Sequence, residues 1–222
     1  SHVLPENHLR NLKTDKEGFL WILSDETASR FDIQKDSVTL ILRHDKKNLH
    51  STILFDMYDD GHILWFATYG GGINGYHKKT GAWTYITEEE GLTNNAVYGI
   101  LPENDSIIWA TTNIGLSRIN TRTLKCTGYY YEDGLQDNCF DEKGVLQSGN
   151  KLFFGGIKGF TCLDLKEFRT REYEFPVFIH MIEYYKNSKK FVLNNLEWGK
   201  ITLPPGAGPV DLHLSALSFT GN

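Results

Sequence analysis

The sequence predicts an all-β fold built from repeated four-stranded units, and three observations carry that prediction. No segment keeps a helical stripe of apolar residues for ten positions. Short apolar runs are separated by Gly, Asn and Asp turns, and one aromatic position recurs at a constant interval. The chain has 222 residues, 40% of them hydrophobic and 13% aromatic, which is enough for one substantial core and part of another.

The strongest signal is a repeat with a period of about 44 residues. An aromatic side chain, preceded by an aliphatic residue and a turn-forming group, recurs four times. The aromatic residues are Trp21, Trp65, Trp109 and Phe153. A second column recurs every 43 residues, with a fainter copy at 4–9, and consists of Leu49, Leu92 and Leu135. Two independent columns that recur with nearly the same period indicate a repeat array.

Each repeat reads as four short strands, which in the second copy we expect at 53–56, 63–68, 73–77 and 83–87. Several strands are apolar on both faces, which suits a sheet covered on either side by its neighbours. Four strands in each repeat, stacked on like units, predict the blades of a β-propeller. Each repeated aromatic ring should then be buried against the next blade.

The repeat stops after Asp164, so we predict a partial propeller of three complete blades and one without its outer strand. Such an arc exposes blade faces and sheet edges, so the chain should pair with another copy or belong to a longer ring. The predicted domains are blades at 1–167, a charged linker at 168–175 and a second β unit at 176–222, too short for a complete sandwich. Its strand-like segments are 177–185, 189–194, 200–205 and 210–219.

One glycine-rich turn admits a different interpretation. Gly70, Gly72 and Gly75 read literally as G-x-G-x-x-G after a strand, the phosphate-binding fingerprint of dinucleotide enzymes. However, strand, turn and strand follow, where a pyrophosphate would need a helix N-terminus, and the full triplet does not recur in the other repeats. We therefore favour turn residues that tolerate positive φ and let a backbone pass close by.

Composition argues against several classes of function. A net charge of −5 without a dense basic stripe disfavours nucleic acid as a partner, and no apolar run reaches the roughly 18 residues of a membrane span. The histidines lack metal-binding spacings, and the glutamates at 88–90 read as a solvated loop. We predict no catalytic residue, metal or cofactor. The three cysteines, without a C-x-x-C pair, should be small core residues: Cys126, Cys139 and Cys162.

The candidate ligand-binding residues lie between blades. Their polar members can hydrogen-bond sugar hydroxyls, but they also form Asx-turns without any ligand. Their tyrosines can stack on sugar rings, but outer-strand aromatics also pack between blades. Both readings stay open for Asn94, Asn95, Asp137, Asn138, Tyr129 and Tyr131.

The second repeat resembles the two-component regulator propeller repeat. That repeat has a Trp-centred strand, a Thr, a Gly-Leu turn, an aromatic strand and Gly-Leu-x-x-Asn. The matching residues here are Trp65, Thr68, Gly72-Ile73, Tyr85 and Gly91-Leu92-Thr93-Asn94-Asn95. The next copy has Trp109, Thr112, Gly115-Leu116 and Gly134-Leu135. Residues 138–160 are similar to the last repeat before the immunoglobulin-like, triple-tyrosine domain of hybrid two-component sensors.

The resemblance implies a non-enzymatic fragment of the periplasmic sensor region of a Bacteroides-type histidine kinase anchored in the inner membrane. The second unit would be the start of the immunoglobulin-like domain, the ligand an oligosaccharide, and the remainder of the sensor chain a partner that carries the signal to transcription. Two other functions stay open. One is a propeller scaffold that binds another protein, and the other is a propeller lyase or glycosidase.

Overall fold

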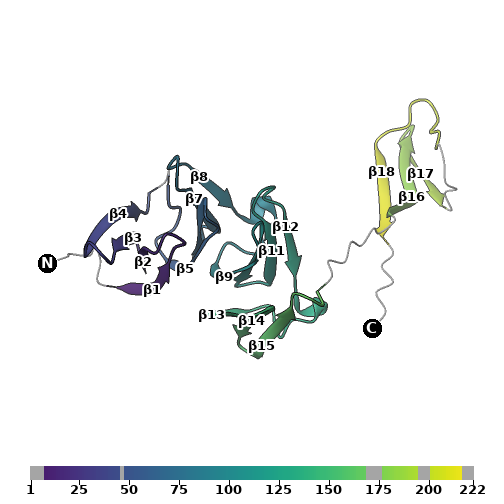
Figure 1. Ribbon diagram of the computed structural model, residues 1–222. Coiled ribbons are helices and arrows are strands. Elements are labelled where there is room, and N and C mark those ends of the chain that lie inside the picture. The colour runs from purple at the N-terminus through teal and green to yellow at the C-terminus, as the bar shows by residue number, and fades with distance from the viewer. Residues whose placement is uncertain (1–7, 46–47, 169–176, 195–200, 217–222) are drawn as a thin grey trace. The chain divides into compact units, whose positions relative to one another are not determined.

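Four antiparallel sheets follow one another along the first 168 residues of the computed structural model, which describes residues 8–45, 48–168, 177–194 and 201–216 (Figure 1). We call these sheets blades 1 to 4. Blade 1 comprises β1 (Leu9–Thr14), β2 (Leu20–Ser24), β3 (Thr27–Asp32) and β4 (Ser37–Arg43). Blade 2 comprises β5 (Leu54–Asp59), β6 (Ile63–Thr68), β7 (Ile73–His77) and β8 (Trp83–Ile86). The strands of each blade are hydrogen-bonded in chain order.

Blade 3 comprises β9 (Val97–Asn104), β10 (Ile107–Thr112), β11 (Leu116–Asn120) and β12 (Cys126–Tyr129). Blade 4 has three strands, β13 (Phe140–Ser148), β14 (Lys151–Gly156) and β15 (Gly159–Asp164). The predicted partial propeller, with three complete blades and one incomplete, is therefore confirmed. The inner strand predicted at 53–56 runs instead as Leu54–Asp59, because its apolar alternation continues through Met57.

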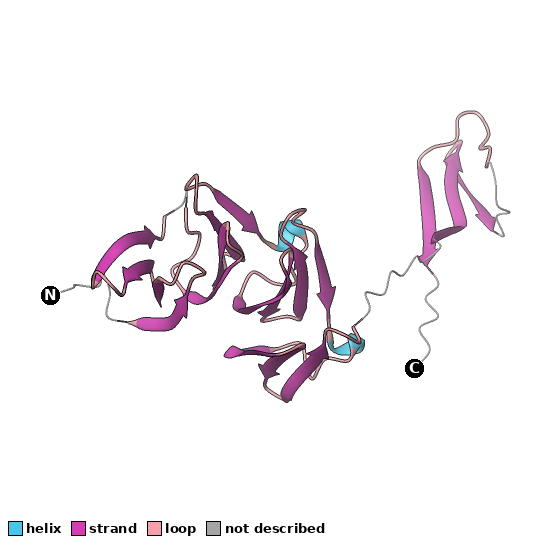
Figure 2. Ribbon diagram, in the orientation of Figure 1, coloured by secondary structure: helices cyan, strands magenta, loops and turns pink. Residues whose placement is uncertain are grey.

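Strands dominate the chain (Figure 2), and the helices of the described residues are two single turns, η1 (Glu88–Glu90) and η2 (Tyr131–Asp133). Neither turn could reach across a lipid bilayer. The glutamates predicted as a loop form η1 because Thr87 and Glu90 cap it reciprocally and Gly91 ends it at φ 94°.

Each blade has an aromatic face, which carries the repeated Trp or Phe, and a reverse face. The aromatic face of one blade packs on the reverse face of the next, and this happens three times. Trp21 and Leu23 meet Leu64 and Phe66 between blades 1 and 2. The same arrangement puts Trp65 against blade 3 and Trp109 against blade 4. Side chains of alternate strand positions thus fill consecutive inter-blade cores.

A carboxylate, buried in blade 1 and half-buried in blades 2 and 3, accepts a hydrogen bond from each indole. The Nε1 atoms of Trp21, Trp65 and Trp109 donate hydrogen bonds to Asp15, Asp60 and Glu103 at 2.8, 2.9 and 2.9 Å. These acids lie five or six residues before the indole. At the equivalent positions before Phe153 the chain has Gln147 and Ser148. Phe153 has no N–H group to donate, and blade 4 accordingly has no carboxylate there to accept a hydrogen bond.

The expectation that Phe153 is buried like the tryptophans is wrong. Trp21, Trp65 and Trp109 are at most 1% exposed, but Phe153 is half-buried because no further blade covers it within the described residues. In place of a fourth strand, the described part of blade 4 has Phe168, which follows the turn after β15. Its ring centroid lies 5.2 Å from that of Trp109, so the indole stays covered.

The second unit, Arg169–Asn222, contains one described sheet in the order β17–β16–β18. Its strands are β16 (Val177–Lys186), β17 (Lys189–Asn194) and β18 (Val210–Ala216). The strand predicted at 200–205 is wrong for its described residues, 201–205, which form a loop that leads into a turn at Pro205–Gly206. The immunoglobulin-like assignment stays a prediction, and all of the predicted linker except Phe168 lies outside the described residues.

Candidate functional site: the connecting rim

One end of the blades gathers most of the sequence-predicted site residues. In an up-and-down sheet, the turn between the second and third strands and the connection to the next blade lie at the same end. This end, the connecting rim, is formed by the connections at 44–53, 87–96 and 130–139 together with the turns at 69–72, 113–115 and 157–158. Of the connection at 44–53, residues 46–47 lie outside the description.

The glycine-rich turn of blade 2 is part of this rim. The backbone N–H groups of Gly70 and Gly72 both donate to the carbonyl of Asn95, each at 2.9 Å. A Cβ on Gly72 would collide with the Ile86 carbonyl, and one on Gly75 would lie 2.6 Å from the Trp65 ring. The glycines are therefore required by packing, and the N–H groups that would cradle a phosphate already have a partner.

A second set of hydrogen bonds ties each connection to the third strand of the blade that it enters. The acceptors, on β7, β11 and β15, are Asn74, Ser117 and Thr161. The donors are the backbone N–H groups of His50, Thr93 and Gln136, at 2.8, 3.0 and 3.0 Å. The matching residue of blade 1, Ser29, is 1% exposed, and its Oγ has no hydrogen-bond partner among the described residues.

The predicted residues of the connection at 87–96 hold its own backbone. Asn94 Oδ1 accepts from the Ala96 N–H at 3.0 Å, and its Nδ2 donates to Glu88. Asn95 Oδ1 accepts from the Glu88 N–H at 3.0 Å. These are the Asx-type contacts that need no ligand. Ligand contact by these two residues stays a prediction.

The equivalent connection at 130–139 repeats this pattern. Asp137 Oδ1 accepts from the N–H groups of Asn138 and Cys139, and its Oδ2 lies 2.7 Å from Lys158 Nζ in the turn of blade 4. The hydrogen bond from Lys158 lowers the pKa of Asp137 below its usual value. Asn138 Oδ1 accepts from the Tyr131 N–H, and the Asn138 carbonyl accepts from the Gly115 N–H.

The two predicted tyrosines differ in position. Tyr129 is half-buried, with its ring centroid 5.2 Å from that of Trp109, and burial raises its pKa. It is thus part of the core between blades 3 and 4. Tyr131 begins η2 and is 59% exposed on the rim, so its ring is accessible to a ligand.

Sequence reasoning missed four further rim residues. Tyr69 is 54% exposed in the turn of blade 2, and Ile114 and Ile157 are exposed in the turns of blades 3 and 4. Tyr98 lies between the turns, and its hydroxyl is 3.3 Å from Asn113 Oδ1. Below them Phe55 is buried, 6.1 Å from Tyr69 and 5.3 Å from Tyr98 between ring centroids. The signal was the repeat itself, since the exposed turn residues are 45 and 43 positions apart.

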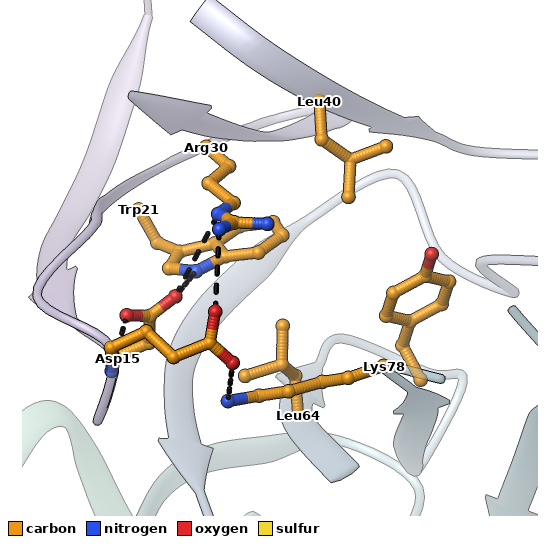
Figure 3. Close-up of a pocket in the computed structure, with 8 residues that line it drawn as sticks. Asp15, Trp21, Arg30, Leu40, Leu64 and Lys78 are labelled. Carbon is orange, nitrogen blue, oxygen red and sulfur yellow. Dashed lines mark hydrogen bonds and ion pairs between the residues drawn. The ribbon is translucent and has the colours of Figure 1, made fainter. Parts of the chain in front are cut away.

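A small cavity at the other end lies between blades 1 and 2 (Figure 3). Its volume is about 100 Å³, well below the roughly 300 Å³ at which small-molecule pockets begin. Its lining residues are Asp15, Glu17, Trp21, Arg30, Leu40, Leu64, Tyr76 and Lys78. The figure shows the charged side chains pointing toward one another across the blade boundary.

A chain of ion pairs along the cavity links the two blades. Glu17 lies 3.3 Å from Arg30 in blade 1 and 3.2 Å from Lys78 in blade 2, and Lys78 is 2.7 Å from Asp59. Burial alone would lower the pKa of Lys78, but its bonds to Asp59 and Glu17 outweigh burial and raise the pKa. Lys78 therefore stays protonated, so this arrangement fits a structural clamp better than a nucleophile.

The prediction that all three cysteines are core residues is wrong for Cys162, which is exposed. Cys126 is half-buried and packs against the core between blades 2 and 3, and Cys139 is half-buried. All three are free thiols. Burial, followed by the charge of Glu90, raises the pKa of Cys126 to about 11, which makes its thiol a poor nucleophile at neutral pH. Within the described residues, no group of three His, Cys, Asp or Glu side chains could hold a metal ion.

The chain matches no family model and no curated protein. It is similar to solved structures. One is the extracellular domain of the hybrid two-component system BT3049 from Bacteroides thetaiotaomicron, with a TM-score of 0.61 and 21% sequence identity. The likeness is one of fold. The alignment covers 74% of this chain and 24% of that domain, so this chain spans about a quarter of its length.

Two further similar structures agree on the fold. The extracellular domain of the one-component system BT4673 from the same organism has a TM-score of 0.52 and 17% identity, over 85% of this chain and 36% of that one. The β-propeller domain of Cps50 (Swd1) from Myceliophteria thermophila has a TM-score of 0.53 and 16% identity, over 73% of this chain and 54% of that one. The propeller fold is thus shared with extracellular sensor domains.

Proposed function

We propose that this chain is a ligand-sensing fragment of the extracytoplasmic region of a hybrid two-component sensor, and that its connecting rim binds an oligosaccharide. The likeness in fold to extracellular sensor domains supports the first part. The exposed tyrosines of the rim, Tyr69 and Tyr131, support the second, because aromatic faces stack on the apolar faces of sugar rings.

The proposed mechanism needs no chemistry by this fragment. An oligosaccharide would bind one arrangement of the sensor region more tightly than another and so shift the balance between them. The remainder of the chain would carry that shift from the periplasm across the inner membrane to transcription.

Calorimetry of the chain against a panel of oligosaccharides tests the proposal. Tyr69→Ala and Tyr131→Ala should each weaken binding of a responding sugar by about fivefold, since one aromatic contact contributes about 1 kcal/mol. Phe191→Ala, which removes an exposed aromatic ring of the second unit, is the matched control and should leave affinity unchanged.

A protein-binding scaffold is the second candidate, and the exposed aliphatic rim residues Ile114 and Ile157 favour it. The two candidates differ in which variants matter. Suppose that no oligosaccharide gives heat and that a protein partner binds the natural chain. Loss of that partner's binding in Ile114→Ser and Ile157→Ser would then reject the sugar proposal in favour of a protein-binding scaffold.

A further inference from the structure

The aromatic face of blade 4 has no cover within the described residues. Leu146, Phe153, Phe160 and Cys162 lie on this face, because Leu146 and Cys162 flank Phe153 in register and Phe160 flanks Gly155, two residues further along β14. Leu146 and Phe160 are 62% and 65% exposed. The rings of Phe153 and Phe160 lie 6.0 Å apart between centroids and form one apolar patch.

The aromatic face of blade 3 is covered by the reverse face of the next blade. Leu101, Trp109 and Leu116 occupy the register positions of Leu146, Phe153 and Phe160, respectively. All three are buried, because the reverse face of blade 4 covers them with Phe140, Leu152 and Phe154.

The reverse face of blade 1 has no other blade on it within the described residues. Leu12, Ile22, Ser29 and Ile41 are neighbours across its four strands. The outer two are exposed, Leu12 at 56% and Ile41 at 37%, whereas Ile22 and Ser29 between them are 8% and 1% exposed. The residues that match Leu12 in blades 2 and 3 are Met57 and Ile100. Both are buried, because the aromatic face of the preceding blade covers them.

We propose that the chain associates head to tail, with the aromatic face of blade 4 of one copy docked on the reverse face of blade 1 of a second copy. In all three interfaces within the chain an aromatic face meets a reverse face, so this pairing continues an interface that the fold already uses. One face of each kind is left over. Two copies that satisfy both would complete eight blades, within the range of closed propellers.

The chemistry of the open face suits burial in an interface. In blades 1 and 3 an arginine, Arg30 or Arg118, lies beside the indole and is paired with an acid. Blade 4 has the neutral Cys162 at this position. The charged residues of this face, Lys151 and Asp164, are paired with each other two residues away along the strands, so a second copy would meet them as an ion pair.

Sedimentation equilibrium of the whole chain tests the proposal with one variant for each face. Phe160→Asp and Leu12→Asp place a charge on a side chain that is already exposed, so both variants should fold, which their unfolding midpoints check. The natural chain should form species heavier than 25.4 kDa. Each variant alone should associate at least about thirtyfold more weakly, as expected for an interface hot spot.

An equimolar mixture of the two variants is the decisive sample. One variant keeps an intact reverse face and the other an intact aromatic face, so the mixture should recover a species of twice the monomer mass. Ile33→Asp, in the exposed turn between β3 and β4, is the matched control and should behave like the natural chain.

Three results would overturn the proposal. The natural chain could stay monomeric at every concentration. Leu12→Asp could leave association intact while Phe160→Asp abolishes it, which would indicate two aromatic faces paired with each other. Finally, the mixed variants could fail to associate.

Discussion

Blades 3 and 4 carry the same kind of aromatic face at matching register positions and differ in what lies on it. Trp109 is 1% exposed beneath blade 4, with Glu103 on its indole nitrogen and Phe168 at its outer side. Phe153 holds the same place on β14 and remains half-buried. The burial of each aromatic ring is therefore decided by the next blade along the chain, and blades 2 and 3 each contribute one face to two cores.

The largest expected contrast comes from truncating the two rings. Trp109→Ala should lower the free energy of unfolding by about 3–5 kcal/mol, because it empties a closed core and leaves Glu103 without its indole partner. Phe153→Ala should cost clearly less, since its ring is already partly in water. Urea unfolding monitored by circular dichroism compares them in the Leu12→Asp variant, which keeps the face of Phe153 free of a second copy. Equal losses would contradict the difference in cover.

A smaller contrast comes from enlarging the residue beside the ring. Gly75 lies next to Trp65 in the closed core between blades 2 and 3, and Gly75→Ala should cost about 1–3 kcal/mol because the new Cβ overlaps the indole. Cys162 has the same place beside Phe153, and Cys162→Leu should be nearly neutral on the open face. If Gly75→Ala left the free energy of unfolding unchanged, the interface between blades 2 and 3 would be packed less tightly than the overlap with the indole implies.

Blades 1 and 3 also differ in the hydrogen bonding of the matching serine on the third strand. Ser117→Ala should cost about 1 kcal/mol, because it leaves the Thr93 N–H without an acceptor. Ser29→Ala removes a buried hydroxyl that has no partner among the described residues, so it should be neutral or slightly stabilising. Thermal unfolding of the two variants decides this, and a loss in Ser29→Ala as large as in Ser117→Ala would refute it.

The smallest effect concerns the ion pair that ties the turn of blade 4 to its connection. The folded pKa of Asp137 is lowered, chiefly by the hydrogen bond from Lys158, so the ionised carboxylate stabilises the fold above its ordinary pKa of 3.8. That contribution disappears as the pH falls through the lowered value. Asp137→Asn should therefore reduce the urea midpoint at neutral pH, and the difference from the natural chain should vanish in strong acid.

Asp141→Asn is the control for this titration, since Asp141 is an exposed aspartate of the adjoining strand. It should change the midpoint little at either pH. A deficit of Asp137→Asn that persists unchanged in acid would mean that the side-chain geometry, and not the charge, carries the effect.

The repeat made most of the blade architecture predictable. A period that places Trp21, Trp65 and Trp109 in one column also places them on one face of successive sheets. The exposure of Phe153 was not predictable from its residue type. An aromatic residue at the repeated position does not indicate whether another blade follows to cover it. The strand predicted at 200–205 failed because its short apolar alternation precedes Pro204-Pro205, which together end a strand.

The candidate site was only partly predictable for a related reason. Residue type and spacing identified four polar residues of the connections, Asn94, Asn95, Asp137 and Asn138. Residue type does not reveal whether such a side chain hydrogen-bonds to its own backbone or to a ligand. Tyr69 lies outside the regular strands, where no alternation marks which side chains are exposed. The carboxylates that bind the indoles were visible in retrospect as acids five or six residues before each Trp.

Hydroxyl-radical footprinting, read by mass spectrometry, tests the central claim most directly, because it reports how far each side chain is covered. The Leu12→Asp variant is the suitable sample, since it keeps the open face free of a second copy. We predict strong oxidation of Leu146, Phe153 and Phe160 and protection of their counterparts Leu101, Trp109 and Leu116. Similar oxidation of the two sets would contradict the account of blades that cover one another in order.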